Sequence, residues 1–208
     1  MLEPLRYLVK EQVKFLASHA TYDIFDAETS DQIGVAEEVI GPVTQVLRWF
    51  VSKQLMPTTV EVREKPDDSL VFTIIRGWYL FQSRVEIHDA QGDLVGYFKS
   101  KILSWSGGFW VYDRKDREFA EVKGNFIGFK YRVLTPDGGV ELGKVSKTWA
   151  GVVKELFTSA DTYMVEVNED LNEQPISKML VLAAALAVDM IFKSESRTQG
   201  GTLLDLGG

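Results

Sequence analysis

The alternation of apolar and polar positions predicts a chain built mostly of short β-hairpins. In four segments an apolar strand leads to a polar turn, usually entered by an aspartate, and then to a second strand with a small residue near its start. Such alternation between turn-forming residues is typical of antiparallel hairpins. The four segments are residues 22–34, 85–96, 110–120 and 131–143. Two more strands are expected at residues 60–63 and 70–76.

The turn aspartates are interpreted as structural residues. Asp26, Asp89 and Asp113 stand at the turn entrance, where a carboxylate can accept hydrogen bonds from backbone amides two residues further on. Gly92, Gly138 and Gly139 can take the positive φ that tight turns require. Because the aspartate recurs at one turn position, we do not assign these residues to catalysis or metal binding.

One apolar helix is predicted near the end of the chain, at residues 179–192. A helix that is apolar all round must be buried. Its fourteen residues would reach about 21 Å, against about 30 Å for the hydrocarbon of a bilayer. Asp189 in lipid would cost about 2.5 to 3.5 kcal/mol. The pattern therefore favours a core helix, and a membrane-inserting segment is the alternative. Its core residues are Leu180, Leu182, Leu186, Asp189 and Phe192.

Ten to twelve short strands leave exposed sheet edges unless the sheet closes on itself, and a barrel of that size has an interior to fill. We therefore predict a closed antiparallel β-barrel threaded by its own C-terminal helix, with Asp189 near one mouth. One domain is expected over residues 1–193, followed by a disordered tail at 194–208. An amphipathic helix at 43–55 is expected to cover the rim, with membrane-surface binding as its alternative.

Composition removes several kinds of chemistry. The 208 residues contain no cysteine, which excludes disulfides, thiolate catalysis, thiolate zinc sites and palmitoyl anchors. The N-terminal residues lack the pattern of a secretory signal, and Leu2 stands where myristoylation needs glycine. These features lead us to expect a cytoplasmic protein without a lipid anchor.

The net charge of −7 is unevenly distributed. Residues 1–93 carry 9 Lys/Arg and 15 Asp/Glu, residues 94–154 carry 11 and 6, and residues 155–208 carry 3 and 9. The basic middle could form an anion site if the strands bring its cations together, and solvated strand faces are the alternative. The candidate headgroup-binding cations are Lys99, Lys101, Lys123, Lys130, Arg132, Lys144 and Lys147.

Enzymatic motifs are absent from the sequence. There is no G-x-S-x-G, P-loop, dinucleotide fingerprint or H-E-x-x-H, and the only histidines are His19 and His88. We expect no catalytic residues and no enzyme. The aromatic residues that crowd positions 78–112 are interpreted mainly as core and cross-strand pairs. Overall acidity argues against nucleic acid as a partner.

Three segments in fixed order resemble the phospholipid scramblase family. They are GKVSKTWAG at 143–151, KELFTSADTY at 154–163 and VDMIF at 188–192. Residues 22–34 and 96–101 resemble the short bacterial members, so the resemblance covers residues 5–193. It implies the tubby C-terminal-like architecture, a barrel of about twelve strands around an apolar helix.

The resemblance also implies lipid-related activities. The family name refers to calcium-stimulated mixing of phospholipids between leaflets, whereas relatives with the same barrel bind phosphoinositides or act in signalling. The family's calcium region corresponds to residues 161–173, which lack EF-hand spacing, so a solvated acidic loop is the alternative to a calcium site. Its candidate ligands are Asp161, Glu166, Asn168, Glu169, Asp170 and Glu173. No cofactor is expected, with calcium at this region as the alternative.

We expect a non-enzymatic module that binds lipid headgroups or a protein partner. Its expected location is cytoplasmic, peripheral at the inner face of the plasma membrane, on anionic phospholipid. The alternative is a genuine scramblase, which would need an insertion element, and the only candidate is the apolar helix. The sequence does not assign an oligomeric state.

Overall fold

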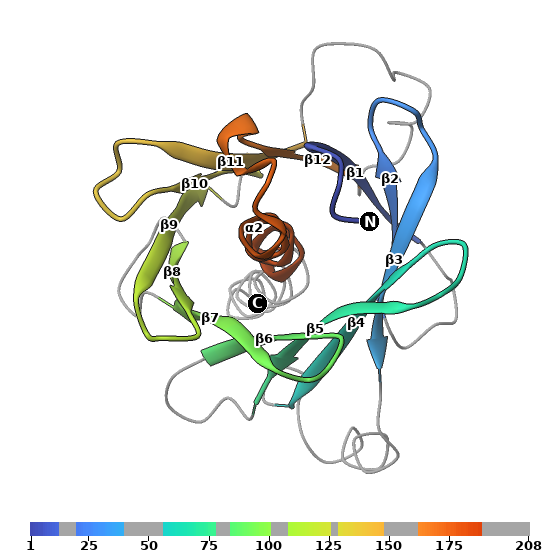
Figure 1. Cartoon of the computed structure of the whole chain (residues 1–208), viewed down its shortest axis with the longest axis horizontal. Helices are drawn as coiled ribbons and strands as arrows, with labels where there is room; N and C mark the ends of the chain where they lie inside the picture. Colours follow the sequence, from blue (N-terminus) through green and yellow to red (C-terminus); the bar gives the residue numbers. More distant parts are fainter. Residues whose placement is uncertain are drawn as a thin grey trace, which may run out of the picture.

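The computed structural model describes residues 1–12, 20–39, 56–77, 84–100, 108–125, 129–147 and 162–188. In this part of the chain twelve strands form one closed antiparallel barrel around helix α2 (Figure 1). Each strand pairs with its neighbours in sequence, and β1 pairs with β12 to close the sheet. The predicted fold is confirmed.

In the described residues the twelve strands come first, and a 3-10 turn and a helix follow the last strand. The strands are β1 (Arg6–Glu11), β2 (Thr21–Asp26), β3 (Gln32–Val39), β4 (Thr58–Glu64), β5 (Leu70–Arg76), β6 (Arg84–Asp89), β7 (Leu94–Ser100), β8 (Gly108–Asp113), β9 (Glu118–Asn125), β10 (Lys130–Leu134), β11 (Glu141–Ser146) and β12 (Thr162–Val167). They are followed by η2 (Glu169–Leu171) and α2 (Pro175–Ala187).

The four predicted hairpins are β2–β3, β6–β7, β8–β9 and β10–β11. Their aspartates form the turns as expected. The carboxylates of Asp26, Asp89 and Asp113 each accept a hydrogen bond from the backbone amide two residues further on, at 2.7, 3.0 and 2.8 Å. This geometry confirms that these aspartates are turn formers.

Helix α2 lies inside the barrel, and every residue from Ser177 to Val188 is buried (Figure 1). Pro175 occupies the first helical turn, where its missing N–H costs nothing. Leu180, Leu182 and Leu186 belong to the main core cluster, which confirms their predicted role. None of the helices among the described residues has the length and apolarity to cross a membrane.

Several predictions concern residues outside the described ranges. Asp189 and Phe192 of the core helix are among them, as are the amphipathic helix at 43–55 and the tail at 194–208.

Small residues on the strands make room for α2. A Cβ added to Gly96 would lie 2.4 Å from the carbonyl oxygen of Tyr112 and 3.1 Å from Cδ2 of Leu180. At Gly143 it would lie 2.7 Å from the carbonyl oxygen of Glu166 and 2.7 Å from Cγ1 of Val181. Gly96 and Gly143 are two of the small residues that recur at the start of the second hairpin strand. Their recurrence therefore reflects close packing around the helix.

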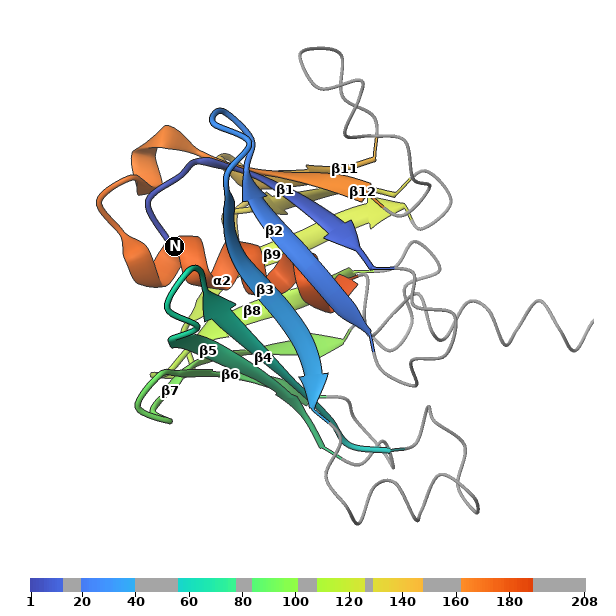
Figure 2. The same cartoon turned by 90° about the vertical axis from the view of Figure 1, so that its right-hand side faces the viewer.

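The two ends of the barrel differ in how the strands are joined. The five hairpin turns, the N-terminus and η2 lie at one end, which we call the turn end (Figure 2). The links that follow β1, β3, β5, β7, β9 and β11 leave from the opposite end, which we call the connection end.

A buried lysine holds the turn end together. Lys178 of α2 is only 1% exposed, and its ammonium donates to the carbonyl oxygen of Glu3 at 2.7 Å. It also lies 3.4 Å from both the carbonyl and the side-chain oxygen of Asn172. Burial lowers the pKa of Lys178 below its usual value. This residue joins the N-terminal segment to the loop before the helix.

Candidate functional site

Three of the predicted cations lie side by side on the outer wall of the barrel. Lys123 of β9 is directly opposite Arg132 of β10, which is directly opposite Lys144 of β11. Their side chains are 54%, 63% and 47% exposed. We call these three residues the cation row. Like charges placed directly opposite each other repel, so the row depends on nearby carboxylates to reduce the repulsion.

Each member of the cation row has a glutamate partner. Lys123 lies 2.9 Å from Glu121 and Lys144 lies 3.2 Å from Glu166, and Arg132 forms an ion pair with Glu141. Surface ion pairs of this kind are worth about 0 to 1 kcal/mol, so a phosphate group could replace a carboxylate at little cost. The glutamates weaken the positive potential of the row, but the three cations remain exposed to an anion from solution.

The remaining predicted cations are more scattered. Lys130 is exposed and lies two residues before Arg132 on the same face of β10. The Lys147 ammonium lies 5.0 Å from the ring centroid of Phe129. Lys99 lies on β7, two strands away from Lys123. Lys101 is outside the described residues.

Beside the cation row is a group of aromatic and basic residues, of which the sequence had singled out only Lys99 as a candidate cation. The Arg84 guanidinium lies 3.8 Å from the ring centroid of Tyr97, and the rings of Tyr97 and Tyr112 stack at 4.9 Å with 13° between their planes. Lys99 is directly opposite both Arg84 and Trp110. We call these residues of β6, β7 and β8 the aromatic–cation cluster: Arg84, Tyr97, Lys99, Trp110 and Tyr112.

The cluster agrees with the cross-strand part of the sequence interpretation, because Tyr97 of β7 is directly opposite Tyr112 of β8. Phe98 and Phe109 are buried and lie 5.1 Å apart, as expected of core aromatics. Tyr97, Trp110 and Tyr112 are instead partly exposed, on the outer wall. Partial burial, and then the carboxylate of Asp116, raises the pKa of Tyr97. The two-residue alternation of side chains along a strand could have identified these aromatic residues as outward-facing, because each stands next to a buried residue.

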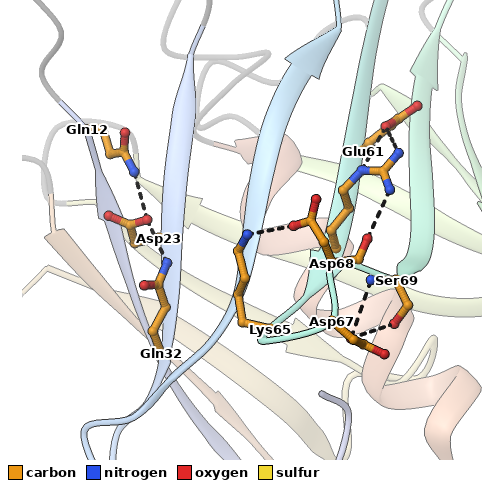
Figure 3. Close-up of polar contacts among 9 residues, drawn as sticks. Gln12, Asp23, Gln32, Glu61, Lys65, Asp67, Asp68 and Ser69 are labelled. Carbon is orange, nitrogen blue, oxygen red and sulfur yellow. Dashed lines mark hydrogen bonds and ion pairs between the residues drawn. The ribbon is translucent and has the colours of Figure 1, made fainter.

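On the wall formed by β1–β5, carboxylates are paired with amide groups and with cations. Figure 3 shows Asp23 accepting hydrogen bonds from Gln12 at 2.8 Å and Gln32 at 2.9 Å. The same view shows Lys65 paired with Asp68 at 2.6 Å. Arg63 forms an ion pair with Glu61 at 2.6 Å.

The structure separates the candidate calcium ligands. Glu166 lies on the outer wall against Lys144, whereas the side-chain oxygen of Asn168 accepts a hydrogen bond from the amide of Asp170 at the start of η2. Glu169, Asp170 and Glu173 are exposed at the turn end, and Asp161 is outside the described residues. Within the described ranges, no three acidic or histidine side chains come together in a way that could hold a metal ion. Calcium binding stays a prediction.

The comparison with protein families agrees with this barrel. The model of the Scramblase family matches residues 21–195, which is most of the chain. The chain belongs to the Scramblase family. This membership confirms the resemblance found in the sequence.

The similar relatives of this Scramblase-family barrel are distant ones. It is 24% identical over 119 residues to phospholipid scramblase 2 of Homo sapiens, covering 54% of this chain and 39% of the relative. Phospholipid scramblase family member 5 of Homo sapiens is 25% identical over 122 residues, covering 56% and 44%. Altered inheritance rate of mitochondria protein 25 of Saccharomyces cerevisiae is 23% identical over 148 residues, covering 64% and 39%. The matched part spans only about two fifths of each relative.

Proposed function

We propose that this Scramblase-family barrel is a non-enzymatic module that binds anionic phospholipid headgroups at the cytoplasmic face of a membrane. The observation that carries the proposal is the cation row on the wall of β9–β11, in a family whose relatives are named for phospholipids. Three adjacent, exposed cations can each donate charge-assisted hydrogen bonds to phosphate oxygens. Lys130, on the same face, adds a fourth positive charge nearby.

Helix α2 is the reason to prefer binding over movement of lipids between leaflets. The helix is enclosed by the barrel wall, so its insertion into a bilayer would require the core to open. Each leucine buried in such a core contributes about 1.5 to 3 kcal/mol. A peripheral role leaves this core intact.

Co-flotation of the purified protein with vesicles tests the proposal. Phosphatidylcholine vesicles with and without phosphatidylserine should be compared at low and physiological salt, each with and without calcium. We expect binding to the anionic vesicles only, weakened by salt, because exposed charges are screened. Absence of binding under every condition would refute the proposal. Binding to both vesicle types that resists salt would favour insertion and call for a leaflet-mixing assay.

The cation row itself is tested by a pair of triple variants. Lys123→Gln with Arg132→Gln and Lys144→Gln should weaken binding to anionic vesicles by about fivefold for each cation removed. The matched control replaces the partners: Glu121→Gln with Glu141→Gln and Glu166→Gln should strengthen binding. If the two triple variants bind equally, the cation row is not the headgroup site.

A further inference from the structure

Charge is unequally distributed around the connection end of the barrel. We compare the three residues of each strand nearest to that end. In β6–β11 they include six cations and a single acid, Glu86. In β1–β5 they include four acids and two cations, of which Arg76 is buried. The six cations are Arg84, Lys99, Lys123, Lys130, Arg132 and Lys144.

The turn end carries the opposite charge. Its segments are residues 1–5, 27–31, 65–69, 90–93, 114–117, 135–140 and 168–174, and together they contain eleven Asp or Glu and four Lys or Arg. An anionic surface would repel this end and attract the β6–β11 part of the connection end. The barrel thus has an electrostatic orientation along its axis as well as around it.

Arg84, Lys99 and Trp110 of the aromatic–cation cluster lie within the basic part, whereas Tyr97 and Tyr112 lie further along β7 and β8 towards the turn end. Tyrosine and tryptophan prefer the boundary between water and hydrocarbon, since each has an apolar body and a polar tip. Lys99 beside them can extend its ammonium to headgroup phosphates, whereas Arg84 lies over the Tyr97 ring and is ion-paired with Glu86 at 3.0 Å. Tyr97, Trp110 and Tyr112 are the partly exposed aromatic residues on this wall.

The geometry of the cluster fits a lipid surface better than a nucleic acid. Single-stranded nucleic acids are held by bases that stack on free aromatic faces. Here Tyr97 of β7 is stacked against Tyr112 from β8, while Arg84 reaches its ring from β6 on the other side. Both faces of the Tyr97 ring are therefore occupied, and this ring has no free face on which a base could stack.

We propose that the barrel docks on an anionic bilayer along the connection-end part of β6–β11. Arg84, Lys99 and Trp110 of the aromatic–cation cluster enter the headgroup layer, the cation row lies beside them, and the acidic turn end points away from the membrane. This proposal rests on the proposed function and adds to it an orientation and a second contact region.

Single-cysteine labelling can measure this orientation, because the chain has no cysteine of its own. An environment-sensitive fluorophore would be attached at Glu86→Cys in the docking region, at Gln91→Cys at the turn end and at Glu37→Cys on the opposite wall. On phosphatidylserine-containing vesicles with a quencher near the headgroups, we expect quenching at position 86 and none at positions 91 and 37. Glu86→Cys removes an acid, so the label itself does not weaken the docking surface.

A charge-reversal pair gives an independent readout. Arg84→Glu with Lys99→Glu should weaken vesicle binding by at least about tenfold, since each basic residue at the surface is worth roughly fivefold. Lys10→Glu with Lys65→Glu makes the same change in net charge on the β1–β5 wall and should change binding by less than about twofold. Circular dichroism would establish that both variants are folded.

The outcomes separate the two proposals. Vesicle binding with equal quenching at all three positions, or with quenching only at 91 or 37, would overturn the orientation and leave headgroup binding standing. Equal effects of the two charge reversals would also overturn it. Binding of the protein to an RNA oligonucleotide but to no vesicle would overturn both proposals.

Discussion

The interior and the outer wall of this barrel differ in what they tolerate. Inside, α2 is surrounded so closely that Gly96 and Gly143 leave no room for a Cβ. Outside, three cations lie side by side across β9–β11, and each is balanced only by an exposed or partly exposed glutamate pair. The interior follows the demands of packing, and the wall does not. Function in this molecule is therefore to be sought on the wall, and changes there should separate binding from stability.

The largest effect is expected from filling the space beside the helix. Gly143→Val would press against the carbonyl of Glu166 and the side chain of Val181, and overpacking of this kind costs about 3 kcal/mol or somewhat more. Urea unfolding followed by circular dichroism would measure the loss. Gly77→Ala is the control, because a Cβ there has nothing within 4 Å. Equal stability of the two variants would contradict the close contact between wall and helix.

A smaller loss is expected when the turn end loses its buried cation. Lys178→Ala removes the ammonium that donates to the carbonyl oxygen of Glu3 and leaves a cavity, for a loss of about 2 to 4 kcal/mol. Lys65→Ala, which breaks a surface pair with Asp68, should cost less than about 1 kcal/mol. The same urea measurement compares them. A Lys178→Ala variant as stable as Lys65→Ala would mean that this end does not depend on the buried lysine.

On the outer wall, stability and binding should separate. The triple variant Lys123→Gln, Arg132→Gln and Lys144→Gln should unfold at nearly the wild-type urea concentration, because surface substitutions usually change stability by at most about 0.5 kcal/mol each. Its binding to anionic vesicles should nevertheless fall. A loss of stability as large as that of Gly143→Val would show that the cation row serves the fold, and the comparison between interior and wall would fail.

The smallest effect is expected from His88, on the wall near the β6–β7 turn. Its ring nitrogens lie 3.0 Å from the carbonyl oxygen of Gly92 and 3.2 Å from a carboxylate oxygen of Glu86. Both neighbours are acceptors, so the charged ring satisfies both contacts. The backbone carbonyl of Gly92, together with Glu86, raises the pKa of His88.

The direction of the pH effect follows from that shift. Because the folded pKa lies above the unfolded value, the stabilisation is complete below about pH 6.5 and is lost as the pH rises through the folded pKa. Thermal unfolding of wild type and His88→Gln at several pH values would measure it. The difference between the two proteins should shrink on going from pH 6 to about pH 8, and a constant difference would contradict the charged contact.

Local features of the chain were sufficient to predict the architecture. Turn aspartates such as Asp89 and Asp113 act within a few residues, and the alternation of buried and exposed positions is visible along each strand. The apolar run that includes Leu180 and Leu186 required a surrounding wall. Exposed strand edges then favoured closure of the sheet.

The candidate site could be predicted only in part. The basic middle of the chain was visible, but the six candidate cations within the described ranges are not equivalent: three lie in a row, Lys130 lies next to them, and Lys99 belongs to a different group. The cross-strand pair of Tyr97 with Tyr112 was within the prediction for these aromatic residues, but the contact of Tyr97 with Arg84 was not predicted.

The sequence by itself therefore determined the hairpins, the buried helix, the closed barrel and the family. These depend on periodicity, on turn residues and on the need to cover apolar surface. All three can be recognised in the sequence without knowing which distant segments are in contact. Only the tertiary structure decided which charges became neighbours. The bulge between Val133 and Leu134 shifts the pairing of β10 with β11, and one residue of register decides which side chains face each other. Register depends on contacts between distant segments, so composition could indicate a basic region without specifying its cation row.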